Sequence, residues 1–112
     1  MQISFRNKKL EKTLTTARDM VPLHGERRAK LIQQRLAEIE AAPTLAMLRL
    51  LPRPRCHELK GNRKGQLSVD LDHPYRLLFT PDHDPLPQAV AGGLDWAAVT
   101  KVCIQEIADT HE

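Results

Sequence analysis

Residues 55–79 read RCHELKGNRKGQLSVDLDHPYRLLF and contain the strongest local pattern of the chain. Residues 67–71 alternate apolar and polar side chains, as a β-strand with one buried face does. The Asp-His-Pro sequence at 72–74 predicts a turn, and residues 75–79 predict a second strand. We therefore expect a hairpin whose two strands pair in an antiparallel arrangement.

A cluster of cationic side chains precedes this hairpin, in a turn that Gly61 and Gly65 punctuate. Its members are Arg55, His57, Lys60, Arg63 and Lys64. Arg76, on the second strand, is expected on the face opposite Tyr75, because neighbouring residues of a strand point to opposite faces. Cations on fixed elements bind anionic oxygens with little reorganisation, so the arrangement favours a phosphate-bearing ligand. A solvated basic loop on a small antiparallel sheet explains the same residues equally well.

The length of 112 residues predicts a single domain over residues 1–112, large enough to bury a core without disulfides. Aromatic residues are only 4% of the chain, so Leu, Ile, Val and Ala must supply most of that core. Cys56 and Cys103 form neither a disulfide framework nor a zinc-binding pattern. The sequence has no apolar run of about 20 residues and no signal-peptide pattern. We therefore expect a cytoplasmic protein that does not enter a membrane.

Charge is distributed unevenly along the chain, although the net charge is only +3. Residues 1–65 contain 15 Lys and Arg against 6 Asp and Glu, whereas residues 66–112 contain 2 against 8. This asymmetry predicts an anionic partner for the first part, with nucleic acid favoured over a membrane. An acidic protein partner fits the same surface. A pair of solvated basic helices would also explain much of the excess of Lys and Arg in residues 1–65.

The rest of the sequence predicts an α+β domain. Asn7 and Thr44 are expected to cap helices, and Pro22 and Gly25 to separate two of them. Helices that precede hairpin-joined strands are expected to pack on one face of an antiparallel sheet, which leaves its other face partly free. The expected elements are a strand at 2–5, helices at 7–20 and 26–42, a helical turn at 44–51, the hairpin, an irregular loop at 80–95 and a strand at 98–107.

The chain offers proton-transfer groups and cations, but no glycine-rich phosphate loop, serine-nucleophile elbow or Cys/His metal set. Such a set suits cleavage of RNA without a metal or another cofactor. A base takes the 2′-hydroxyl proton, cations stabilise the pentacovalent phosphate, and an acid protonates the leaving 5′-oxygen. Each residue alone has an ordinary explanation: His57 as a surface histidine, or Arg76 as the partner of Asp70 across the hairpin. The candidate residues are His57, Lys60, Arg63, Lys64, Arg76, Asp109 and His111.

Three segments resemble the RelE/ParE superfamily of bacterial toxin–antitoxin modules, most closely its HigB-type plasmid maintenance killer branch. They are HELKGNRKG at 57–65, YRLLF at 75–79, and the strand at 99–107 that runs into DTH at 109–111. The resemblance extends over most of the chain, and the combination of L-K-G with Y-R-x-x-F is moderately specific. It implies a compact RelE-like fold, with an N-terminal strand and a helical hairpin packed on one face of a twisted antiparallel sheet.

The resemblance also implies a function and partners. The family pattern is that of an mRNA interferase, an endoribonuclease that cuts mRNA in the decoding site of the ribosome without a metal ion. A HigA-type helix-turn-helix antitoxin would neutralise it, and operator DNA would be bound only through that antitoxin. By motif, His57 and His111 become acid–base candidates and Asp109 an orienting carboxylate. The other roles carried over by motif are transition-state stabilisation for Lys60 and Arg76, and RNA contact for Arg55, Arg63 and Lys64.

Two features depart from the family pattern. Thr110 stands where many relatives have a tyrosine, and threonine cannot stack on a base. The loop at 80–95 is long for the family and could cover or reshape the site. Two alternatives therefore stay open: a catalytically weak binding module for an antitoxin or RNA, and a ParE-like inhibitor of DNA gyrase. The pair of His57 and His111 argues against the gyrase inhibitor, because that inhibition needs no acid–base pair.

Overall fold

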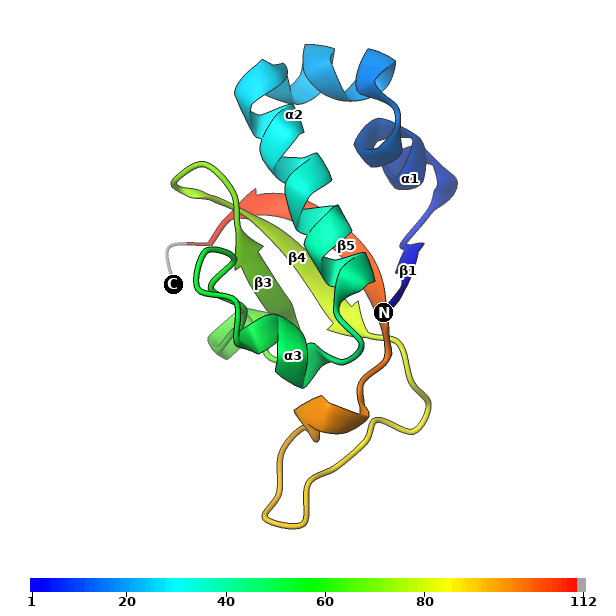
Figure 1. Ribbon diagram of the computed structural model, residues 1–112, viewed down its shortest axis with the longest axis vertical. Helices are drawn as coiled ribbons and strands as arrows, with labels where there is room; N and C mark the ends of the chain where they lie inside the picture. Colours follow the sequence, from blue (N-terminus) through cyan, green and yellow to red (C-terminus); the bar gives the residue numbers. More distant parts are fainter. Residues whose placement is uncertain (111–112) are drawn as a thin grey trace.

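One five-stranded sheet with a layer of helices forms the molecule, as the computed structural model shows for residues 1–110 (Figure 1). His111 and Glu112 lie outside the described residues. The elements are β1 (Gln2–Phe5), α1 (Lys8–Thr15), α2 (Ala17–Ala41), α3 (Leu45–Arg49), β2 (His57–Glu58), β3 (Leu67–Asp70), β4 (Tyr75–Pro81) and β5 (Lys101–Asp109), with short 3-10 turns at Gly61–Arg63 and Trp96–Ala98.

The strands lie in the order β1-β5-β4-β3-β2. The four strands from β2 to β5 pair in an antiparallel arrangement, so the predicted hairpin and antiparallel sheet are confirmed. β1 adds to β5 in parallel, with Gln2 opposite Lys101 and Phe5 opposite Ile104. The antiparallel prediction rested on tight hairpins, and no hairpin constrains β1, which is followed by helices rather than by another strand.

The caps predicted at Asn7 and Thr44 are confirmed, but the division between the first two helices differs from the prediction. The Asn7 side chain accepts a hydrogen bond from the Leu10 backbone N–H at 2.8 Å, and Thr44 does the same for Met47 at 3.3 Å. The first predicted helix, at 7–20, is wrong in extent, because the backbone becomes extended at Thr16 and α2 starts at once. α2 then continues past Pro22, and only Gly25, at φ 78°, interrupts its helical geometry.

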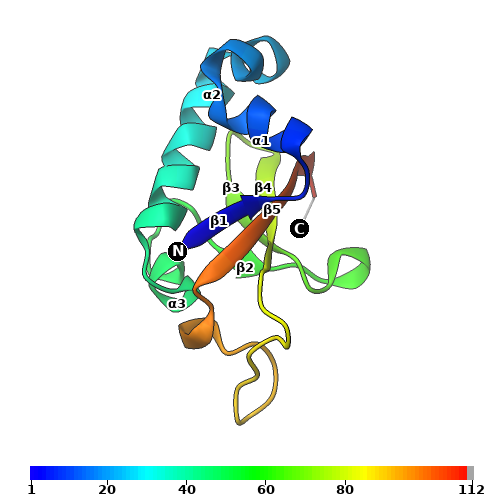
Figure 2. The same ribbon diagram turned by 90° about the vertical axis from the view of Figure 1, so that its right-hand side faces the viewer.

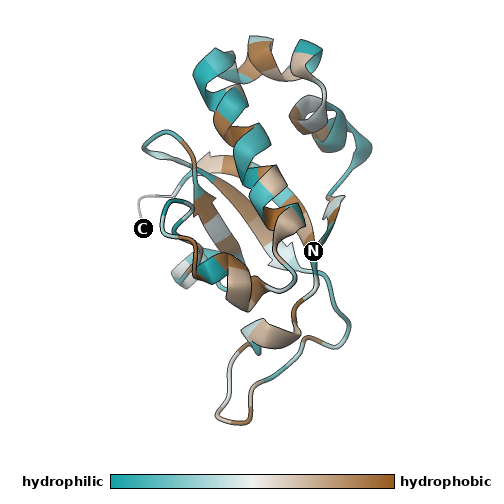
Figure 3. Ribbon diagram, viewed as in Figure 1, coloured by the Kyte–Doolittle hydropathy of each residue, from teal (hydrophilic) through white to brown (hydrophobic). Residues whose placement is uncertain are grey.

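The core lies between the sheet and the helices. Figure 2 shows α2 on one side of the sheet, and Figure 3 shows hydrophobic residues on the strands behind it. Fully buried side chains come from all three helices and the inner strands, so one face of the sheet is covered by the helices as predicted. The largest residues of this core are Phe79, Leu14, Met20, Ile32, Ile39, Leu45, Leu48, Leu67, Leu77 and Ile104.

The loop between β4 and β5 extends from one end of the sheet. It follows the end of β4 (Figure 1). That strand ends at Pro81, whereas Arg76 lies near its beginning. The loop is anchored against the basic turn, because the Trp96 indole N–H donates to the Glu58 carboxylate at 3.0 Å. A cleft of about 200 Å³ lies between Lys64 and Gly65 on one side and loop residues such as Leu86 on the other. The predicted final strand starts later than expected, because residues 96–98 form a 3-10 turn.

An ion pair joins α2 to the turn between β3 and β4. Two nitrogens of Arg28 donate to the two carboxylate oxygens of Asp72 at 2.8 and 3.1 Å, and the Arg28 guanidinium lies 3.6 Å from the centre of the Tyr75 ring. Both charged side chains are less than 20% exposed. The hydrogen bonds from Arg28 lower the pKa of Asp72 below its ordinary value of 3.8.

We expect Asp72→Asn to lower the free energy of unfolding by about 1 kcal/mol at pH 7. The stabilisation requires the charged carboxylate. It is therefore fully present above pH 3.8 and is lost as the pH falls through the lower pKa of the folded state. Urea unfolding of both proteins between pH 7 and pH 2.5 measures this, and the difference between them should shrink only below about pH 4. If the difference in unfolding free energy between the two proteins stayed constant down to pH 2.5, the effect would come from packing rather than from the carboxylate charge.

Candidate phosphate-binding site on the open face of the sheet

Strand register places Arg76 and His57 on the face away from the helices. Tyr75 and Leu77 pack with the helical core, so Arg76 between them points to the opposite face. Arg76 lies opposite Asp70 of β3 and Ala108 of β5. The next row across this face is formed by His57, Ser68, Leu78 and Glu106.

The basic turn folds over part of this open face. It projects on the side of the sheet away from α2 (Figure 2), and Arg63 forms an ion pair with Glu106 of β5 at 3.7 Å. Ser68 and Leu78 are fully buried although the helices lie on the other face. The turn therefore closes one end of the face and leaves the Arg76 end open.

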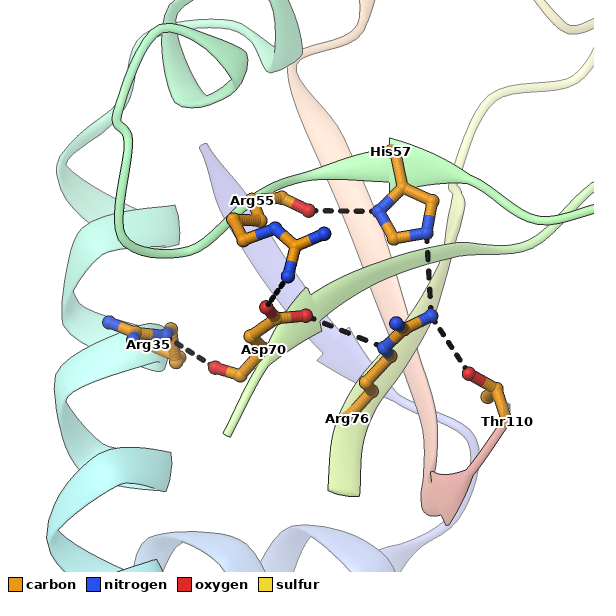
Figure 4. A network of polar contacts seen from close by, with 6 residues as sticks. All are labelled: Arg35, Arg55, His57, Asp70, Arg76 and Thr110. Carbon is orange, nitrogen blue, oxygen red and sulfur yellow. Dashed lines mark hydrogen bonds and ion pairs between the residues drawn. The ribbon is translucent and has the colours of Figure 1, made fainter. Parts of the chain in front are cut away.

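Arg76 is held by three neighbours (Figure 4). Its Nε lies 3.4 Å from Asp70 Oδ1, and its Nη1 donates to the Thr110 hydroxyl at 2.9 Å. The same Nη1 lies 3.5 Å from His57 Nε2. The Arg76 side chain is 15% exposed, so its cation is fixed in position before any ligand arrives.

A backbone contact orients the His57 ring. Its Nδ1 lies 2.9 Å from the carbonyl oxygen of Arg55, and a carbonyl can only accept, so Nδ1 carries the proton of the neutral ring. The lone pair of Nε2 then faces the Arg76 guanidinium, 3.5 Å from its Nη1. Arg55 has a φ of 50°, a left-handed conformation that non-glycine residues rarely adopt and that is found at functional sites.

Asp70 connects the two arginines to the core. Its Oδ2 lies 3.3 Å from Arg55 Nη1, on the side opposite Arg76. Its backbone is fixed twice: the carbonyl accepts from Arg35 Nε at 2.6 Å, and the N–H donates to the Pro54 carbonyl at 2.7 Å. Arg35 is itself buried in α2, so the helical layer determines where the Asp70 carboxylate lies.

A cleft of about 390 Å³ opens beside this network. Polar and cationic groups dominate its walls, which suits an anionic ligand rather than an apolar one. Its lining residues are Arg55, Asp70, Leu71, His73, Pro74, Tyr75 and Arg76.

The other predicted site residues are placed less centrally. Lys60 and Lys64 are exposed on the basic turn. Asp109 lies opposite Tyr75 in the register, so it belongs to the face that Tyr75 shares with the helices, and the structure does not bring it beside Arg76. His111 lies outside the described residues.

Two contacts of Arg76 were not predicted as parts of a site. The sequence indicates Asp70 only as a cross-hairpin partner of Arg76, and Thr110 only as a residue in place of the family tyrosine. The Asp70 contact could have been found from the sequence, because Asp70 and Arg76 are equally far from the centre of the 72–74 turn and therefore lie opposite each other. The Arg35 contact with Asp70 had no local signal.

Other candidate chemistry is not supported by the described residues. Cys56 is buried, and burial raises the pKa of its thiol to about 12, so it is not a reactive thiolate. Within residues 1–110, no three His, Cys, Asp or Glu side chains lie together as a metal site would require. None of the helices in this part of the chain has both the length and the hydrophobicity to cross a membrane.

These features define an α+β domain with a cationic site on the open face of its sheet. A chain of the YoeB–YefM complex from Staphylococcus aureus has a similar structure, with a TM-score of 0.56 and 17% sequence identity. The similarity covers 100% of this chain and 98% of that chain, so it confirms the predicted fold over its whole length. No protein-family model matches the sequence, and a search of curated proteins finds no match either.

Proposed function

We propose that this chain is the toxin of a type II toxin–antitoxin module and cleaves mRNA on the ribosome. The observation that carries the proposal is the fixed Arg76 cation beside His57 Nε2, at the edge of a polar cleft. His57 Nε2 and Arg76 Nη1 lie 3.5 Å apart. A 2′-hydroxyl that attacks its neighbouring phosphate needs a base to take its proton and a cation to stabilise the developing charge. The similar solved structure comes from a YoeB–YefM complex, which supports a protein partner.

In the proposed reaction, His57 Nε2 takes the proton of the 2′-hydroxyl, and the 2′-oxygen attacks the adjacent phosphorus. The bond to the 5′-oxygen breaks, and an acid protonates that oxygen, which leaves a 2′,3′-cyclic phosphate and a 5′-hydroxyl. Arg76 donates to the phosphate oxygens as negative charge builds on them. We assign the acid role to His111, with Asp109 as its orienting carboxylate, and give Lys60 a share of the charge stabilisation.

The remaining cations are assigned to binding. Arg55, Arg63 and Lys64 lie on or beside the basic turn, where they would contact the RNA backbone. We further propose a HigB-type toxin, neutralised by a HigA-type antitoxin with a helix-turn-helix domain. Operator DNA would then be bound only through that antitoxin.

Primer extension on a defined message tests this function. Purified ribosomes translate the message with and without the protein, and Arg76→Ala serves as the inactive comparison. We expect cuts within codons, and we expect these cuts only when both the ribosomes and the Arg76 side chain are present. If folded, antitoxin-free protein gives no cuts, the ribonuclease proposal fails.

One observation favours a second candidate, a binding module without efficient catalysis. Thr110 occupies the position after β5 and donates no aromatic face, while its hydroxyl accepts from Arg76 at 2.9 Å. A site that cannot stack a base can still bind phosphate through its cations. RNA binding of normal strength without cleavage on translating ribosomes would favour this candidate.

A further inference from the structure

A carboxylate lies in the middle of the proposed phosphate site. Asp70 places one oxygen 3.4 Å from Arg76 Nε and the other 3.3 Å from Arg55 Nη1 (Figure 4). The buried Oδ1 makes no hydrogen bond within the described residues, so it contacts Arg76 as an ion pair only. An acidic group beside a phosphate site repels the ligand, and its presence there needs a compensating role.

The two arginines differ in how tightly they are held. Arg76 is 15% exposed and has further contacts with Thr110 and His57. The Arg55 side chain is 68% exposed. Asp70 itself cannot move far, because Arg35 and Pro54 fix its backbone on both sides. Arg55 is therefore the member of this trio that is able to change partner.

We propose that Asp70 is an internal counter-ion that keeps Arg76 aimed and releases Arg55 to an incoming phosphate. This inference rests on the proposed function and deepens it. In the free protein Asp70 neutralises part of the charge of both guanidinium groups. When phosphate enters the cleft, Arg55 exchanges the carboxylate for the phosphate, while Arg76 stays paired through Nε and presents its remaining N–H groups. Asp70 is thus a positioning residue.

This role predicts that binding and cleavage respond in opposite directions to loss of the charge. Asp70→Asn removes the repulsion of phosphate and frees Arg55, so RNA should bind more tightly. The same change loosens Arg76, so the bound RNA should be cleaved more slowly. A purely structural Asp70 would weaken both, and a bystander would change neither.

The variant is well matched, since asparagine keeps the shape of aspartate and the backbone bonds to Arg35 and Pro54. Its binding to a 2′-O-methyl RNA oligonucleotide, which cannot undergo 2′-hydroxyl attack, should tighten about tenfold at low ionic strength. Its single-turnover cleavage rate should fall about 10- to 100-fold. Thermal unfolding of both proteins verifies that the fold is kept.

A double-mutant cycle with Arg55→Gln identifies the exchanging partner. The gain in affinity from Asp70→Asn should be mostly lost when Arg55 is already glutamine. An equal gain in both backgrounds would mean that Arg55 does not change partner, and it would overturn the proposal. No gain in either background would overturn it as well.

The binding half of the test does not depend on ribonuclease activity. Titration with inorganic phosphate, followed by NMR of the arginine Nε–H signals, should shift Arg55 most in the parent protein. If the parent protein shows this shift and the affinities follow the double-mutant cycle, but no RNA is cleaved, the counter-ion proposal is supported and the ribonuclease proposal is contradicted. If the Arg55 signal of the parent protein does not shift at high phosphate concentration, the counter-ion proposal is wrong, whatever the cleavage assay shows.

Discussion

Replacement of Arg76 by alanine should lower the rate of RNA cleavage about 10²- to 10³-fold, the effect of removing one preorganised donor to a developing anion. Arg76 is held in position in the proposed site through Asp70 and Thr110. In cells the variant should no longer arrest growth. Single-turnover cleavage of a ribosome-bound message measures the effect directly.

Two comparisons separate this effect from loss of net charge or of folding. Arg18→Ala removes the same charge from an exposed helical position and should cleave normally. Arg76→Lys keeps the charge but cannot reach Asp70 and Thr110 together with one ammonium group, so it should recover only part of the rate. Since Arg76→Ala leaves a buried Asp70 oxygen without its ion-pair partner, we also expect a loss of about 1–2 kcal/mol in stability. An Arg76→Ala protein that cleaves at the parent rate would show that the site lies elsewhere.

His57→Asn should lower cleavage by about 10²- to 10³-fold, the usual contribution of a general base. Asparagine is the informative substitution. Its side-chain amide lies where His57 has Nδ1, so it can still donate to the Arg55 carbonyl, but it offers nothing in place of Nε2. Binding of uncleavable RNA should therefore change little while the rate constant falls.

His24→Asn provides the matched control, because His24 lies on α2 and belongs to the helical layer. It should leave cleavage and its pH profile unchanged. If His57→Asn retained the parent rate, another group would have to supply the base.

Local patterns predicted the central hairpin and the helix caps because the physical signal for each lies within a few residues. The alternation at 67–71 and the Asp-His-Pro turn specify the pairing of β3 with β4. The break near Thr16 was missed, since Thr16 makes no side-chain cap and the apolar stripe runs through it. The parallel β1–β5 pair depends on contacts about 100 residues apart in the chain, which periodicity does not report.

The candidate site was predicted as a set of residues but not as a geometry. Arg76 and His57 were identified from their residue types, and the structure brings them to 3.5 Å. Their orientation depends on the Arg55 carbonyl and on Arg35, which acts from a helix through the backbone of Asp70. Such contacts are set by tertiary packing, so no short pattern contains them. Asp109 lies opposite Tyr75 rather than opposite Arg76, and its role as an orienting carboxylate stays a prediction.

The pairing of the first strand with the last has a consequence for synthesis of the protein. While the chain is being translated, β1 has no neighbour and β4 has only β3, because β5 lies between them in the sheet. Arg76 likewise lacks its Thr110 contact until the final strand has left the ribosomal tunnel. The helical layer and the hairpin can form early, but the site is completed last. The contact between Arg76 and Thr110 therefore forms only after β5 has paired with β4.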